Sequence, residues 1–186
     1  MNLFYKFLAA ILFFSTPFLS YGKDEGQIFF ESNPLNISFP QAGSIFLPIY
    51  SVLKKDIPGD GDFNLEIYIL VPEGNTYKNK YVGTIHPEGA PPVVRSVFFH
   101  DVNKSPGSEL FVLVSYSTNH YDSGGEYFKV YIYNREVDSS TGGLSRVTSV
   151  EEKLGEGLEG SIEGKPSRAP YKNAADVRKL LKKFGY

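Results

Sequence analysis

The feature that most constrains this chain is the shortness of its apolar segments after residue 22. Each segment is only long enough for a β-strand, and residues that favour turns follow it. Tyrosine and phenylalanine are abundant within the segments, as is typical of strands that pack side by side. This pattern predicts an antiparallel, mostly β protein. The turn signals are Asn33-Pro34, Pro58-Gly59, Gly74-Asn75, Ser123-Gly124-Gly125 and Gly142-Gly143.

Two segments indicate how the strands are layered. Residues 128–133 alternate between apolar and polar or aromatic side chains, which favours a strand with two different faces. Residues 109–114 are almost continuously apolar after Glu109, as in a central strand covered on both faces. Regularly spaced short strands predict an antiparallel β-sandwich of about eight strands. The predicted strands are 27–32, 44–50, 65–71, 80–86, 93–100, 109–116, 127–134 and 144–150.

The C-terminal part departs from this pattern. Residues 154–170 are rich in Gly and Pro, which predicts a loop after a sandwich domain that comprises residues 23–153. Residues 171–186 predict one α-helix, with Asn173 as its N-cap and Gly185 at its end. Val177 and Leu181 share a face, so we expect the helix to pack on the same domain. Its basic opposite face is either a solvated surface or a contact for an anionic partner or a membrane surface.

Residues 1–22 have the composition of a secretory signal peptide. Lys6 precedes an apolar run over residues 7–14, and small residues, Ser20 and Gly22, stand before the expected cleavage site. The run is shorter than the roughly 20 residues that a helix needs to cross a bilayer. We therefore expect a periplasmic or secreted protein that begins at Lys23 and has no stable membrane span after cleavage.

Composition excludes several functions. The chain has no cysteine, which excludes disulfides, thiol catalysis and Cys-ligated zinc and suits a bacterial periplasm better than an animal secretion. The net charge of −2 argues against binding to nucleic acid, which needs a basic surface. None of the three histidines belongs to a recognisable catalytic motif, and no carboxylate lies in an apolar segment that would raise its pKa. The sequence therefore predicts a protein that is not an enzyme.

One loop has the residue types of a calcium site. Asp101, Asn103, Ser105 and Glu109 place oxygen-bearing side chains at loop positions 1, 3, 5 and 9, the alternation with which a calcium loop surrounds its ion. The other interpretation is a tight hairpin loop closed by hydrogen bonds from its Asp and Asn side chains, with Pro106 where a calcium loop has glycine. Calcium is thus the one possible cofactor, in a structural or adhesion-type β domain.

The segment 101–134 also carries a family resemblance. An Asp-containing loop leads to Glu109-Leu110 and a hydrophobic strand, and a Ser-Gly loop with a nearby tyrosine follows. In this order the segment resembles the periplasmic inhibitors of invertebrate-type (I-type) lysozyme. The resemblance implies an exported β-sandwich whose Ser-Gly loop enters the lysozyme cleft. The partner-binding residues that it implies are Ser123, Gly124, Gly125 and Tyr127. Without it, the same residues are explained by a hairpin turn and a strand residue that packs across the sheet.

The export hypothesis predicts the mass of the mature chain. Protein isolated from its native host should begin at or near Lys23, because a signal peptidase removes the segment before it. Intact-mass spectrometry of the periplasmic or secreted fraction measures this directly. A full-length chain in the cytoplasm would contradict the hypothesis.

Overall fold

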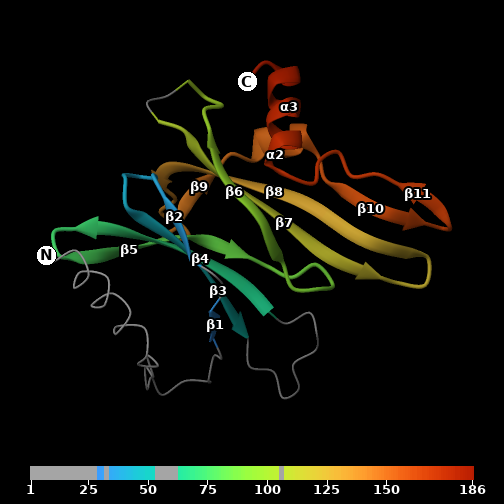
Figure 1. The fold of residues 1–186 in the computed structure, drawn as a ribbon, viewed down its shortest axis with the longest axis horizontal. Coiled ribbons are helices and arrows are strands. Elements are labelled where there is room, and N and C mark those ends of the chain that lie inside the picture. Colours follow the sequence, from blue (N-terminus) through green and yellow to red (C-terminus); the bar gives the residue numbers. More distant parts are fainter. Residues whose placement is uncertain (1–28, 32–33, 53–62, 105–106) are drawn as a thin grey trace, which may run out of the picture.

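The computed structural model describes residues 29–31, 34–52, 63–104 and 107–186. The predicted signal peptide therefore lies outside the described residues, as does Ser105 of the predicted calcium loop. Two antiparallel sheets pack in a sandwich-like arrangement, and two helices cover the outer face of the second sheet (Figure 1). No helix in these ranges is long and apolar enough to cross a membrane.

The first sheet has five strands in the order β1-β3-β4-β5, with β2 also paired to β3. The second has six strands in the order β11-β10-β8-β7-β6, with β9 also paired to β8. The strands of the first sheet are β1 Phe29–Glu31, β2 Leu35–Ile37, β3 Ser44–Val52, β4 Phe63–Glu73 and β5 Thr76–Ile85. Those of the second are β6 Val93–His100, β7 Glu109–Asn119, β8 Ser123–Val137, β9 Leu144–Arg146, β10 Gly157–Ile162 and β11 Lys165–Ser167.

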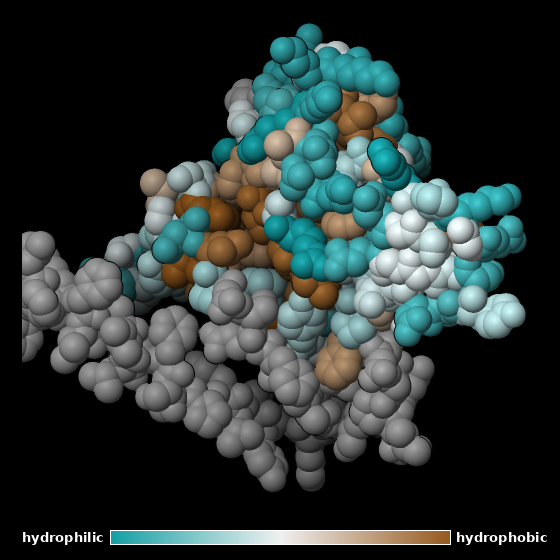
Figure 2. Space-filling model, turned by 45° about the vertical axis from the view of Figure 1, so that its right-hand side comes forward, coloured by the Kyte–Doolittle hydropathy of each residue, from teal (hydrophilic) through white to brown (hydrophobic). Residues whose placement is uncertain are grey.

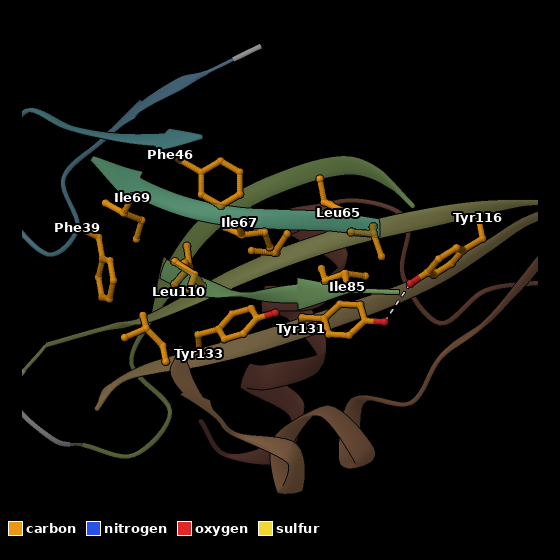
Figure 3. Close-up of a cluster of buried hydrophobic side chains, with 14 residues drawn as sticks. Phe39, Phe46, Leu65, Ile67, Ile69, Ile85, Leu110, Tyr116, Tyr131 and Tyr133 are labelled. Carbon is orange, nitrogen blue, oxygen red and sulfur yellow. Dashed lines mark hydrogen bonds between the residues drawn. The ribbon is translucent and has the colours of Figure 1, made fainter. Parts of the chain in front are cut away.

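The main core lies between the two sheets (Figure 3). Leu65, Ile67 and Ile69 project from β4 toward the second sheet, because successive strand residues point to opposite faces. On β7 every residue from Glu109 to Tyr116 is buried, because β7 is covered by the first sheet on one face and by helices on the other. The prediction of a mostly β, antiparallel fold with a doubly covered strand at 109–114 is confirmed.

The helical layer contains α2 (Thr148–Leu154) and α3 (Ala174–Phe184). The Asn173 side chain accepts a hydrogen bond from the Asp176 amide at 3.0 Å, and Gly185 ends α3 with a φ of 86°. Val177 and Leu181 are fully buried against Phe98 and Phe111 of the second sheet. The predicted C-terminal helix therefore packs on the sandwich, and its basic residues Arg178, Lys179, Lys182 and Lys183 are exposed.

Three predictions about this fold need correction. The described residues contain more than eight strands and a second helix, α2, which replaces the last part of the strand predicted over 144–150. The segment predicted as a loop over 154–170 contains the hairpin β10–β11. Glu163 and Gly164 both have positive φ, 51° and 73°, as in the two-residue turn that favours tight hairpins. Of the glycines that suggested a loop, Gly157 and Gly160 are residues of β10, Gly155 ends α2 and Gly164 lies in the turn of the hairpin.

The docking of α3 predicts that substitutions at two adjacent residues change the free energy of unfolding by different amounts. Leu181→Ala should lower the free energy of unfolding by about 2–5 kcal/mol, because Leu181 is fully buried between the helix and the sheet. Lys182→Ala, on the exposed face, should change it by less than about 0.5 kcal/mol. Urea denaturation of both variants measures the two values, and equal small effects would show that α3 is not docked.

Candidate partner-binding surface

Two hairpins of the second sheet end side by side, on the right of Figure 1. The turn between β7 and β8 is closed by the His120 amide, which donates to the Ser123 carbonyl at 2.8 Å. The Glu163 amide of the β10–β11 turn donates to the Asp122 carbonyl at 2.6 Å. Residues 120–122 and 162–164 therefore form one structure, called the paired tip below. Because backbone hydrogen bonds fix both turns, the paired tip is organised without a partner.

The paired tip exposes two large apolar side chains. Tyr121 has a relative exposure of 108 %, so that it projects into solvent, and Ile162 is 46 % exposed. Asp122 and Glu163 are exposed beside them and give the paired tip a negative rim. In Figure 2 hydrophobic residues gather in the middle of the molecule, whereas the right-hand side of that view is mostly white and teal. Tyr121 is thus a projecting aromatic side chain on a largely polar end of the molecule.

The predicted Ser-Gly loop is not a loop. Ser123, Gly124 and Gly125 are the first residues of β8. Gly124 and Gly125 pair with β7 on one side and with β10 on the other, and Ser123 pairs with β10. Gly124 lies between Asn119 of β7 and Ser161 of β10. The exposed turn is one step earlier, at residues 120–122. The prediction that the Ser-Gly segment forms the projecting end of the hairpin is therefore wrong in its position.

Gly125 of this segment and Gly160 of β10 serve a close contact within the molecule. A Cβ on Gly125, whose φ is 141°, would lie 2.2 Å from the Glu159 carbonyl oxygen of β10. A Cβ on Gly160 would lie 2.0 Å from the Gly124 carbonyl oxygen. Real Cβ atoms do not approach a carbonyl so closely, so only glycine lets β8 and β10 pair here.

Tyr127 is also engaged within the protein. It is half-buried, and its hydroxyl donates to the Glu156 carboxylate. Burial raises the pKa of Tyr127 to about 12, and the neighbouring Glu156 carboxylate adds to the shift. Glu156 in turn pairs with Lys129 at 3.0 Å, and Lys129 pairs with Glu88 at 2.7 Å. Tyr127 therefore belongs to a polar network with Glu156, Lys129 and Glu88, and it lies away from the paired tip.

The loop predicted to bind calcium uses its carboxylates for backbone hydrogen bonds. Asp101 Oδ1 accepts from the Lys104 amide at 2.7 Å, a short closure typical of Asp turns. Glu109 is only 2 % exposed, and its Oε2 accepts from the Val102 amide at 2.8 Å. Among the described residues no group of three or more His, Asp or Glu side chains is arranged to hold a metal. The described part of the loop, including Asn103, thus favours the tight hairpin interpretation.

Tyr121 is not among the partner-binding residues predicted from the sequence. The signal for it was present, because a tyrosine between His120 and Asp122 stands in a polar connection where a buried strand would not place it. The fold and surface together define a β-sandwich domain with a helical outer layer and a projecting pair of hairpins. No protein-family model matches this chain, and neither a curated protein nor a solved structure matches it.

Substitution of the two adjacent glycines of β8 by alanine should have opposite effects on stability. Gly125→Ala should lower the free energy of unfolding by about 1–3 kcal/mol or more, because the new methyl group meets the Glu159 carbonyl and the φ is strained. Gly124→Ala should be tolerated or slightly stabilising, since the nearest atom to its Cβ position is the Thr118 carbonyl oxygen at 3.9 Å. Thermal unfolding of both variants tests this, and equal tolerance would contradict the pairing of β8 with β10.

Proposed function

We propose that this chain is an exported, non-enzymatic binding protein that inhibits a lysozyme-type glycosidase with its paired tip. The observation that carries the proposal is the complete exposure of Tyr121 on a turn that backbone hydrogen bonds hold in place. The resemblance of residues 101–134 to lysozyme inhibitors supports the choice of partner. The composition of residues 1–22 supports export.

A rigid projecting tyrosine is well suited to enter a cleft. Tyrosine brings a large apolar area and a hydroxyl donor while losing few rotamers on binding, and it is enriched among residues that dominate interface energies. Because the hydrogen bonds of His120 and Glu163 already order the paired tip, binding does not have to order the loop. Ile162, from the neighbouring turn, adds apolar area beside the ring.

The chemistry of the partner's cleft follows from the mechanism of glycosidases. Such enzymes place two carboxyl groups on opposite sides of the scissile bond. The phenol of Tyr121 would donate a hydrogen bond to one of them, and its ring would occupy a sugar subsite. Asp122 and Glu163 would then meet the rim of the cleft, which favours a partner with basic residues there. In this proposal Tyr121 takes the inserting role that the resemblance implied for Ser123.

Removal of the tyrosine ring tests the proposal. Tyr121→Ala should weaken inhibition of an I-type lysozyme by about thirtyfold or more, which corresponds to the roughly 2 kcal/mol of an interface anchor. Its thermal stability should stay unchanged, because the side chain is fully exposed. The measurement is an inhibition constant from a lysozyme turbidity assay, together with a melting curve.

Tyr77→Ala is the matched control. Tyr77 is also an exposed tyrosine, at 53 %, but it belongs to β5 of the other sheet, near the β4–β5 turn. We expect this variant to inhibit as the parent does. Equal inhibition by the parent, Tyr121→Ala and Tyr77→Ala would show that the contact lies on another surface. Failure of the parent to inhibit any type of lysozyme would refute the proposed function.

A further inference from the structure

A groove separate from the paired tip lies where β5 of the first sheet approaches β9 and the connection from β8 to β9. Its volume is about 470 Å³, within the roughly 300–1,000 Å³ of small-molecule sites. The two walls meet closely, because a Cβ on Gly143 would lie 2.6 Å from the Val82 carbonyl oxygen. Gly143 therefore holds the β8–β9 connection against the edge of β5, and the groove is a fixed part of the fold.

Tyr133 contributes an unusual hydroxyl group to this groove. The residue is only 2 % exposed, and its hydroxyl forms no hydrogen bond with any part of the chain that the structure describes. Nearby Tyr116 and Tyr131 differ, because their hydroxyls bond to each other at 2.9 Å (Figure 3). Burial raises the pKa of Tyr133, so its phenol keeps its proton and remains a donor. Among the described residues, the Tyr133 hydroxyl oxygen is not one of the fully buried side-chain atoms that lack a partner, so it reaches the groove and can donate to a ligand there.

The absence of a side chain on Gly83 makes room for this ring. A Cβ on Gly83 would lie 3.0 Å from Tyr133 Cε1 and 3.3 Å from its hydroxyl oxygen. The phenol therefore lies against the backbone of β5 at the groove, where Gly83 is also part of the lining. A larger residue at position 83 would crowd Tyr133 and narrow the groove.

The other polar groups of the groove offer both donors and acceptors. The hydroxyls of Tyr81 and Thr84 bond to each other at 2.6 Å, and since one proton serves that bond, the second hydroxyl still has a proton to donate. His86 Nδ1 lies 2.8 Å from Asn64 Oδ1, an acceptor, so the neutral ring carries its proton on Nδ1. That leaves Nε2 of His86 as an acceptor.

The charged groups of the groove are largely committed to intramolecular bonds. Arg146 uses Nε and one terminal nitrogen to pair with Glu151, and it lies over the Tyr131 ring at 4.7 Å. Asp138 accepts from the Ser140 amide at 2.9 Å and from the Ser140 hydroxyl at 2.7 Å, and these bonds lower its pKa. Asp138 disfavours an anionic ligand and Arg146 disfavours a cationic one. The remaining hydrogen-bonding capacity suits a neutral ligand that both donates and accepts.

We propose that this groove binds a neutral, hydroxyl-rich saccharide. Sugar hydroxyls both donate and accept hydrogen bonds, and the C–H face of a pyranose ring can pack against a tyrosine ring, which Tyr81 provides. The Tyr133 hydroxyl completes its hydrogen bonding with a ligand hydroxyl. This site is independent of the paired tip, because it lies between other strands and uses none of its residues.

The test is a titration of the purified protein with chitotriose and, separately, with maltotriose, followed by amide NMR shifts. At least one saccharide should shift the amides of Gly83, Thr84 and Gly143, with a dissociation constant of about 1 mM or tighter. Tyr133→Phe should weaken this affinity about fivefold or more, because it removes one hydrogen bond. Its melting temperature should stay nearly equal, since the hydroxyl that the change removes forms no hydrogen bond with the described part of the chain.

Tyr171→Phe is the matched control in the opposite layer of the second sheet. The Tyr171 hydroxyl accepts from the Val130 amide at 3.2 Å and donates to the Gly155 carbonyl. This variant should therefore have a lower melting temperature and unchanged saccharide affinity. Absence of groove shifts at about 10 mM of both saccharides would overturn the proposal, as would equal affinities of the parent and Tyr133→Phe. No lysozyme takes part, so this result is separate from that of the inhibition assay.

Discussion

The backbone amides of β8 need hydrogen-bond acceptors along the whole 15-residue strand, and the architecture depends on how these are supplied. One edge pairs with β7, while β10 and β9 cover only the two ends of the other edge. Between them the Val130 amide donates to the Tyr171 hydroxyl at 3.2 Å and the Ile132 amide to Glu151 Oε1 at 2.7 Å. Side chains of α2 and of the segment before α3 thus replace a missing strand.

This arrangement explains why both helices cover the outer face of the second sheet. Glu151 belongs to α2 and also pairs with Arg146 at the end of β9, so the helix is fixed to both the edge of β8 and the next strand. Val150 and Leu154 then turn their apolar side chains onto the second sheet beside Val177 and Leu181 of α3. A carboxylate that is nearly buried and satisfies both an amide and a guanidinium stabilises a single docking geometry for the helices.

The same strand positions both proposed sites. The β10–β11 hairpin pairs with the beginning of β8, which brings Glu163 against Asp122 and organises the paired tip. Near the other end, β9 pairs with β8 and the connection between them closes on β5, which creates the groove around Tyr133. A contact surface for a protein and a pocket for a small ligand can therefore coexist on one strand without sharing residues.

The sequence by itself determined the antiparallel β character, the doubly covered strand at 109–114 and the capped C-terminal helix, because periodicity and caps are local signals. Only the tertiary structure decided the roles of Gly125 and Gly160. Local rules interpret Ser-Gly-Gly as a turn, whereas here glycine is required at position 125 by the approach of a strand more than thirty residues away in the sequence. The exposure of Tyr121 and the unpaired hydroxyl of Tyr133 likewise depend on which strands become neighbours, which no local pattern encodes.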